Sequence, residues 1–352
     1  MRSKIIGTGA CHSLVDVPNS HFAEHVFFDE AGEKLKDSLK VINKLEAITG
    51  IAARRYAKDN KVASDLAFEA AEAAIQNAEI DKESIDYIIV THNYGDIPKG
   101  TRQSDMVPSI AARVKHLLGI KNNSCIAYDM IFGCAGWIES VIHADAFIRS
   151  GLAKRCLVIG VDVLSRVIDP ADRDSMIFAD GAGAGILELT SLDTGILATA
   201  SATFSVDEVD YINFEGSYNE EESPGRRFIK MKGRKIYEFA LVEVPAAMKT
   251  CLDKAGIDID DLKKVFIHQA NEKMDQAILD RFYKLYDKPA PEGIMPMNIK
   301  DFGNSSVATV PTLYDMVRRG QVEGQELNKG DIILFAAVGA GMSLNAIVYR
   351  VD

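Results

Sequence analysis

The sequence has no uninterrupted apolar run long enough to span a bilayer, although 47% of its 352 residues are hydrophobic. It is also short of positive charge, with 40 Lys and Arg against 51 Asp and Glu and a net charge of −11. A chain this acidic has no general attraction to nucleic acid or to an anionic membrane surface. We therefore expect no membrane association and no nucleic-acid partner.

Cysteine is scarce as well. The five cysteines form an odd set without C-x-x-C spacing, which argues against a disulfide framework. The first residues lack the apolar core and cleavage site of a signal peptide, so we expect a cytoplasmic protein with free thiols. His21 and His25 share a helical face, but two histidines without further ligands do not predict a metal site.

A dinucleotide-binding G-x-G-x-x-G motif is absent. The glycine-rich stretch 180–185 leads into an expected strand at 186–189, so a bound phosphate would lack the helix N-terminus that it requires. We expect a tight turn near the functional site at 180–185.

The sequence does contain a weak internal repeat. Thr91 and His268 follow similar stretches, each with an Ile-Asp pair and an apolar run, and Cys134 and Asn304 each follow a glycine. The two pairs are separated by nearly the same number of positions, and a third similar pair of stretches begins at Leu152 and Leu327. Chance similarity is the weaker explanation, so we expect a duplicated chain with halves 1–190 and 191–352.

Hydrophobic periodicity predicts alternating helices and strands, typical of an α/β fold with buried, mainly parallel sheets. One further helix presents Ile110, Val114 and Leu117 on its buried face and ends at Gly119. The expected helices are 65–78, 135–150, 234–255, 272–286 and 305–319, and the expected strands are 85–90, 155–163, 264–267, 332–338 and 344–351.

Three residues together predict a covalent acyl-transfer site. Cys134 follows an apolar stretch and opens a helix, whose free N–H groups and partial positive charge favour a thiolate. His268 ends an apolar strand, and Asn304 lies in a Gly-Asn-Ser-Ser turn. The other cysteines, Cys11, Cys125, Cys156 and Cys251, fit strand or helix patterns and are expected to be small buried side chains.

The motifs around these residues resemble the thiolase superfamily and, within it, 3-oxoacyl-[acyl-carrier-protein] synthase III. They are C-A-G at Cys134, H-Q-A-N at His268, G-N-S-S at Asn304 with Pro311 beyond, D-P-A-D-R at 169–173 leading to D-G-A-G, and G-A-G at 339–341. The resemblance implies a five-layered αβαβα fold with an internal duplication, a homodimer and no permanently bound cofactor. It implies acyl thioesters of coenzyme A or of an acyl carrier protein as substrates.

The resemblance also implies a decarboxylative condensation. Cys134 would accept the acyl group, with the N–H groups of Cys134 and Gly341 holding the oxyanion. A malonyl thioester would then lose carbon dioxide, and His268 and Asn304 would donate hydrogen bonds to the enolate before it attacks the acyl group. The 3-oxoacyl product would start fatty-acid synthesis or enter a specialised lipid or polyketide.

Substrate delivery is predicted from charge. A basic run of Arg and Lys at 226–235 either steers an acidic acyl carrier or the phosphates of coenzyme A, or is simply a solvated loop. The resemblance assigns substrate or carrier binding to Arg173, Arg234, Asn271 and Lys273. The stretch 44–48 lacks the Trp and Arg with which many relatives sandwich adenine, which favours a carrier-bound donor.

Two segments, 21–43 and 207–222, look longer than usual for this family. Tyr211, Phe214 and Tyr218 in the second either wall an enlarged acyl pocket or pack the loop against the protein.

Two rival functions remain open: an acyltransferase that passes the acyl group from Cys134 to an alcohol or amine, and a non-catalytic partner subunit. The intact cysteine argues against the latter. A 3-hydroxy-3-methylglutaryl thioester synthase is disfavoured because no catalytic glutamate can be assigned.

Overall fold

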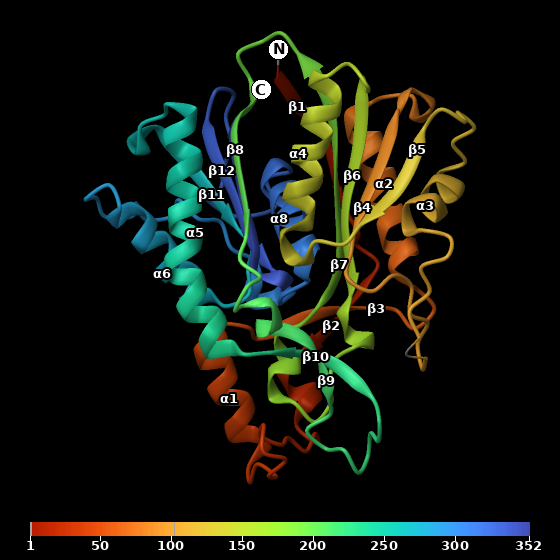
Figure 1. The fold of residues 1–352 in the computed structure, drawn as a ribbon, viewed down its shortest axis with the longest axis vertical. Coiled ribbons are helices and arrows are strands. Elements are labelled where there is room, and N and C mark those ends of the chain that lie inside the picture. The colour runs from red at the N-terminus through yellow and green to blue at the C-terminus, as the bar shows by residue number, and fades with distance from the viewer. Residues whose placement is uncertain (1, 102) are drawn as a thin grey trace.

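The chain folds into five layers, as expected. The computed structural model describes residues 2–101 and 103–352. Helices α2 (Ala63–Ala78) and α3 (Ile110–Leu118) cover the outside of one sheet, and α5 (Gly233–Ala255) and α6 (Glu272–Lys284) cover the outside of the other (Figure 1). Between the sheets lie α4 (Gly136–Arg149) and α8 (Thr309–Arg318), which gives the order αβαβα (Figure 1).

Both sheets have mixed strand directions, so the prediction of mainly parallel sheets was wrong. Antiparallel pairs join β1 to β7, β7 to β6, β12 to β13 and β13 to β8, whereas only the β6–β4–β5 and β11–β12 pairings are parallel. Strands β12 and β13 are joined by the three-residue turn 340–342, which permits only an antiparallel return. The first sheet has the order β1 (Arg2–Ala10), β7 (Asp180–Thr190), β6 (Arg155–Val163), β4 (Tyr87–Thr91) and β5 (Ile126–Met130), and the second has the order β11 (Leu262–Ile267), β12 (Ile332–Gly339), β13 (Ser343–Arg350) and β8 (Gly195–Thr203).

The two sheets repeat one arrangement. The order β1-β7-β6-β4 in the first sheet corresponds to β8-β13-β12-β11 in the second, with the same parallel and antiparallel pairings. The central helices share one core, in which Trp137 of α4 packs edge-on against Phe335 of β12. Because this core draws on both halves, the division of the chain at residue 190 stays a prediction.

The glycine-rich stretch 180–185 is part of strand β7, so the predicted turn was wrong. A Cβ atom on Gly183 would lie 2.7 Å from the Pro311 Cβ atom and 2.7 Å from the Thr312 backbone nitrogen of α8. Glycine is therefore needed here because it lets the central helix approach the sheet closely.

The predicted helices agree with the structure to within a few residues, but the buried face of α3 differs. Leu118 is buried, whereas Leu117 is 43% exposed, so the face runs through Ile110, Val114 and Leu118. The helix ends at Gly119, whose φ is 65°, as the sequence predicts.

Several elements cover the ends of the sheets near the central helices, at the bottom of Figure 1. Helix α1 (Ser38–Thr49) lies in this region with the pairs β2 (Leu14–Pro18) with β3 (Ala53–Ala57) and β9 (Ile212–Gly216) with β10 (Arg227–Met231) (Figure 1). The short helix α7 (Ile299–Phe302) completes it. Among the described residues, no helix combines the length and the hydropathy that a membrane crossing needs.

Candidate active site

Cys134, His268 and Asn304 line one cavity at the start of the central helices. Its volume is about 60 Å³, and most of its other walls are apolar. Strand β11 ends at Ile267, immediately before His268, and Asn304 precedes the turn into α8. The duplication thus brings corresponding points of the two halves together, and the structure joins the three residues that the sequence singles out.

The Cys134 thiol is held in its neutral form. Burial raises its pKa to about 12, and the nearby Asp162 carboxylate raises it further, although a hydrogen bond from Ser306 opposes this. The Ser306 hydroxyl donates to the Cys134 Sγ atom over 3.3 Å. The residues 133–135 form a 3₁₀ turn before α4, and the backbone N–H of Cys134 also lowers the pKa, as expected for this position. Desolvation outweighs the helix terminus here.

His268 is neutral, and its hydrogen bonds select one tautomer. Burial lowers its pKa to about 4. The Thr309 hydroxyl donates to the Ser306 carbonyl over 3.0 Å, so it accepts the Nδ1–H of His268, at 2.7 Å. The Nε2 atom of His268 is then an unprotonated acceptor available to the cavity.

Asn304 is oriented by its own turn. Its Oδ1 atom accepts the backbone N–H of Ser306 at 2.8 Å, which leaves the amide NH₂ group available to the cavity. The backbone of Asn304 is fixed on both sides, by Ile177 at 2.9 Å and Ala179 at 2.8 Å. The side chain is therefore a preorganised donor.

Four polar residues behind the cysteine were not found from the sequence. Asp162 is buried and accepts the backbone N–H of Asn93 at 2.8 Å and its side-chain amide at 2.6 Å. The same amide donates to the Ser306 hydroxyl at 3.1 Å. Burial raises the pKa of Asp162 to about 6. With Thr309, these residues form a hydrogen-bond network that fixes Cys134 and His268. The sequence did carry a signal for two of them, because Asn93 and Asp162 are polar residues at or just beyond the ends of buried strands.

Gly341, which the resemblance assigns to the oxyanion hole, does not line the cavity. Gly339 and Ala340 line it instead. A Cβ atom on Gly339 would lie 2.3 Å from the Cys134 nitrogen, and one on Gly133 would lie 2.5 Å from the Ala340 nitrogen. The backbone beside Cys134 is thus that of residues 339 and 340.

Three of the four residues assigned to carrier binding line a second groove, of about 520 Å³, between α1 and α5. They are Arg173, Arg234 and Asn271, and Lys40 and Lys44 of α1 join them. Asn271 also caps α6 by accepting the N–H of Met274 at 3.1 Å. Lys273 is exposed on α6 and is not among the residues that line this groove.

The basic residues of the run 226–235 do not form one continuous exposed patch. Lys230 is buried and pairs with Asp169 at 2.7 Å and Asp172 at 3.0 Å, so it is not part of an exposed basic patch. Arg234 remains exposed and pairs with Glu238 at 2.9 Å.

The β9–β10 hairpin walls the Cys134 cavity, but through other residues than the predicted aromatics. Ile212, Ile229 and Met231 line the cavity. Phe214 packs behind Tyr94, with ring centroids 5.1 Å apart, and Lys230 lies 3.2 Å from the centre of the Tyr218 ring. Phe214 and Tyr218 therefore pack the loop down and do not line the cavity.

Alkylation of Cys134 by iodoacetamide is expected to be about 100-fold slower at pH 7 than that of a free cysteine, because only the thiolate reacts. With a pKa of about 12, the rate should rise about tenfold per pH unit from pH 7 to 10 without a plateau. Peptide mass mapping at successive times measures the alkylation rate of Cys134. Asp162→Asn should react faster, since it removes a nearby negative charge. A plateau below pH 9 would contradict this account.

Comparison with known proteins identifies the family of the chain. Residues 128–204 match the family model of 3-oxoacyl-[acyl-carrier-protein] synthase III, and residues 252–351 match the model of its C-terminal part. The chain is 31% identical to β-ketoacyl-[acyl-carrier-protein] synthase III 1 of Halalkalibacterium halodurans, over 94% of this chain and 96% of that one. It is 32% identical to the synthase III of Ruegeria pomeroyi, over 97% and 99% of the two chains.

Solved structures agree. The 3-oxoacyl-[acyl-carrier-protein] synthase III of Aquifex aeolicus VF5 superposes with a TM-score of 0.80 at 28% identity, covering 99% of each chain. The resemblance inferred from the motifs is thus confirmed, and the chain belongs to the 3-oxoacyl-[acyl-carrier-protein] synthase III family.

Proposed function

We propose that this enzyme condenses a short acyl thioester with a malonyl thioester, with loss of carbon dioxide, through an acyl-Cys134 intermediate. The observation that carries the proposal is the convergence of Cys134, His268 and Asn304 on one enclosed cavity in a chain of this family. The cavity supplies a nucleophile, a neutral imidazole and an oriented amide donor, which are the groups that this reaction needs.

In the first half-reaction the Cys134 sulfur attacks the thioester carbonyl carbon. The C–S bond to the donor breaks, and the donor leaves as a thiol that carries the proton lost by Cys134. The His268 Nε2 lone pair transfers that proton as the bonds exchange, because the sulfur of a neutral thiol is a weak nucleophile. The backbone N–H groups of Cys134 and Ala340 hold the oxyanion.

In the second half-reaction the carbon–carbon bond of the malonyl group breaks, carbon dioxide leaves, and the electron pair remains as an enolate. The Asn304 amide donates to the enolate oxygen. If His268 loses its Nδ1 proton to solvent and gains one at Nε2, while the Thr309 hydroxyl turns to donate to Nδ1, the imidazole supplies a second donor. The enolate carbon attacks the acyl carbon, the C–S bond to Cys134 breaks, and the Cys134 thiolate takes one proton from solvent.

The cavity favours a short primer. A volume of about 60 Å³ accommodates an acyl group of a few heavy atoms, and the apolar side chains of the hairpin close it. We propose that the donor arrives on an acidic acyl carrier, guided by the cationic groove that includes Arg173, Arg234 and Lys44.

Isotope balance tests the proposed function against the acyltransferase alternative. The protein is incubated with a short acyl donor and a malonyl carrier protein labelled in the free carboxyl group. We expect one labelled carbon dioxide for each 3-oxoacyl product that mass spectrometry detects. Acyl donor consumed without label release, or label released without product, would reject the proposal.

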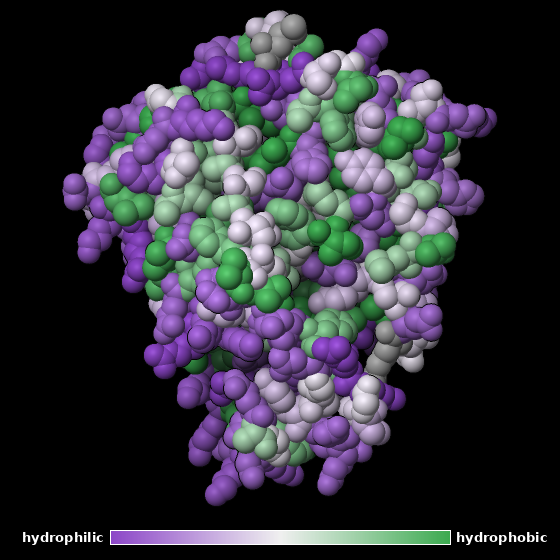
Figure 2. All heavy atoms as spheres, in the orientation of Figure 1, coloured by the Kyte–Doolittle hydropathy of each residue, from purple (hydrophilic) through white to green (hydrophobic). Residues whose placement is uncertain are grey.

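We also propose a homodimer that forms at the edge strand β5, which pairs only with β4 among the residues that the structure describes. Exposed apolar side chains lie on or near this edge: Ile126, Ile131, Met106 and, at 87% exposure, Val107. Apolar and weakly polar side chains also gather in the middle of the face over α4 (Figure 2). Such a patch is typical of an interface between chains.

Light scattering after gel filtration is expected to give twice the chain mass of 38.5 kDa. Ile131→Lys should weaken the dimer by more than about tenfold, because it places a charge in the contact. Leu192→Lys, at an exposed turn between β7 and β8, is the matched control and should leave the mass unchanged. A monomeric wild-type protein would exclude the dimer.

We place the enzyme in the cytoplasm. The support is chemical, because all five cysteines are free thiols, as a reducing compartment maintains them.

A further inference from the structure

Tyr94 lines the Cys134 cavity but has no part in the bond changes described above. Its ring is partly buried and packs among Leu164, Phe178 and Ile229, which are apolar walls of the same cavity. The phenolic hydroxyl is therefore a polar group placed among side chains that would otherwise contact an acyl chain.

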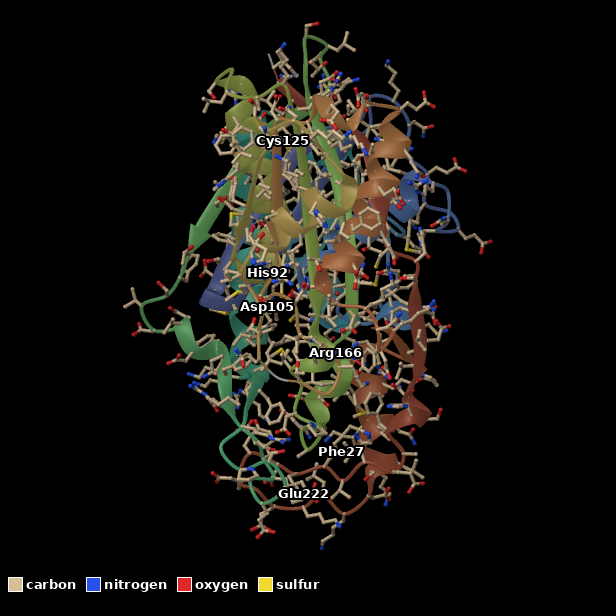
Figure 3. The ribbon with its side chains drawn as sticks, turned by 90° about the vertical axis from the view of Figure 1, so that its right-hand side faces the viewer. Phe27, His92, Asp105, Cys125, Arg166 and Glu222 are labelled. Atoms are coloured by element: carbon tan, nitrogen blue, oxygen red, sulfur yellow. The ribbon has the colours of Figure 1, made fainter. Side chains whose placement is uncertain are left out.

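His92 holds the turn that carries Tyr94. It directly follows strand β4, and Figure 3 shows it just above Asp105. Its Nδ1 atom accepts the backbone N–H of Gly95 at 3.0 Å, so the ring proton is on Nε2, which donates to Asp129 at 2.9 Å. This buried imidazole fixes the backbone on the C-terminal side of Tyr94.

The N-terminal side of Tyr94 and its ring are fixed as well. The backbone N–H of Asn93 donates to the buried Asp162 carboxylate at 2.8 Å. The Phe214 ring packs behind the Tyr94 ring, with the two centroids 5.1 Å apart. The hydroxyl is thus held in place before a substrate arrives, which lowers the entropy cost of using it in binding.

The Tyr94 hydroxyl is a free donor. Among the described residues no group hydrogen-bonds to it, and it is not sealed from solvent as the unpaired hydroxyls of Tyr56 and Tyr283 are. It is accessible from the cavity that the residue lines. Burial raises the pKa of Tyr94, and the nearby Asp162 and Cys134 groups raise it further, so the hydroxyl keeps its proton. Hydroxyl groups in such surroundings are normally paired, so this one is suited to an acceptor on the substrate.

The charges around the cavity favour a neutral acceptor. None of the described residues that line the cavity is Lys or Arg, and His268 is uncharged because burial lowers its pKa to about 4. A carboxylate on the acyl chain would therefore lose its hydration without gaining a cation. A hydroxyl or carbonyl oxygen requires only the hydrogen bond that Tyr94 offers.

We infer that Tyr94 determines specificity, and that its hydroxyl binds a neutral oxygen atom on the acyl chain attached to Cys134. The substrate class is then a short hydroxyacyl or oxoacyl thioester, in preference to an unsubstituted alkyl one. The inference rests on the proposed function, because it requires the acyl-Cys134 intermediate. The thioester carbonyl is not the partner, since the backbone N–H groups of Cys134 and Ala340 are assigned to it.

Donor pairs that differ only in a hydroxyl or a methyl group test this inference. The probes are the pantetheine thioesters of 3-hydroxybutanoate and 3-methylbutanoate and, one carbon longer, of 4-hydroxypentanoate and 4-methylpentanoate. Intact mass at successive times gives the second-order rate constant for acylation of Cys134. In at least one pair we expect the hydroxyl donor to react about 10–100-fold faster with the wild type.

Tyr94→Phe should reduce that ratio to below about threefold, by slowing the hydroxyl donor and not the methyl donor. Tyr283→Phe is the matched control, because it removes a buried, unpaired hydroxyl on α6 that does not line the cavity, and it should keep the wild-type ratio. A crystal of the acylated wild type gives a second measurement that does not depend on the folding of a variant. It should place the chain oxygen within about 3.2 Å of the Tyr94 hydroxyl.

Ratios near one in both donor pairs, or an unchanged ratio in Tyr94→Phe, would overturn the inference and leave acyl transfer intact. A chain oxygen that points away from Tyr94 in the acylated crystal would do the same. If neither these donors nor an acetyl donor adds mass to the protein, the acyl-Cys134 intermediate itself is refuted, and the inference falls with it.

Discussion

Asn304→Ala is expected to lower the release of carbon dioxide from a malonyl thioester by about 10²–10³-fold while acylation of Cys134 continues. The reason is that the oxygen and the NH₂ group of the Asn304 side chain have different partners. Its oxygen is occupied by the Ser306 N–H at 2.8 Å, so only the NH₂ group can serve the enolate. In the proposed first half-reaction the thioester carbonyl is instead held by backbone N–H groups, which the substitution leaves in place.

Cys134→Ala is the complementary variant and should show the opposite pattern. It removes the nucleophile, so the intact protein should gain no acyl mass. Its malonyl decarboxylation should persist, because the donors of Asn304 and His268 remain. Radiolabelled carbon dioxide and intact mass measured on both variants separate the two half-reactions. Loss of both activities in Asn304→Ala, with the fold intact by circular dichroism, would contradict the assigned roles.

The central residues of the site could be predicted because each interrupts a strong pattern. Cys134 and His268 follow apolar runs, and the internal repeat aligns Cys134 with Asn304. Ser306 gave no such signal, because a polar residue in a turn is ordinary and only the fold brings it within 3.1 Å of Asn93. The raised pKa of Cys134 could not be predicted from the sequence either, since desolvation depends on which groups surround the thiol.

The layered fold could be predicted from alternating helices and strands, but strand direction could not. Strand β7 begins with three glycines in six residues, which have no side chains to mark a buried strand. Its identity depends on the close approach of α8 at Gly183, a tertiary contact. The α3 face was ambiguous for a related reason, because Leu117 and Leu118 both continue a helical stripe from Ile110.

The largest effect on stability is expected at Lys230, which the sequence presents as one member of a basic run. Its side chain is 3% exposed and joins two buried carboxylates, Asp169 and Asp172. Asp169 also accepts the Ser217 hydroxyl and the Tyr218 N–H, each at 2.9 Å. Burial alone would raise the pKa of Asp169, but the hydrogen bond and charge of Lys230 and the neighbouring N–H donors hold it below its ordinary value.

Lys230→Met should therefore cost about 3–5 kcal/mol of unfolding free energy at pH 7, because it leaves buried carboxylates without a counterion. Urea denaturation measures this, and Lys249→Met is the matched control. Lys249 pairs with Asp253 at 2.7 Å on the surface, so its loss should cost less than about 1 kcal/mol. Equal losses in the two variants would show that the buried ion cluster does not anchor the hairpin.

The pH dependence of the unfolding free energy should have opposite signs in the wild type and in Lys230→Met. In the wild type the pKa of Asp169 is lower in the folded state than in the unfolded state, where it is about 3.9. Asp169 therefore contributes fully to the unfolding free energy above about pH 3.9, and this contribution is lost as the pH falls through the folded-state pKa. In Lys230→Met, burial without a cation raises the folded pKa, so the folded state binds protons first and gains stability as the pH falls from 7 to 5. Adding Asp169→Asn to Lys230→Met should remove most of that gain, because the amide does not titrate. If the unfolding free energy of Lys230→Met does not depend on pH over this range, water reaches the carboxylates in the variant. The loss of Lys230 then leaves no buried charge without compensation.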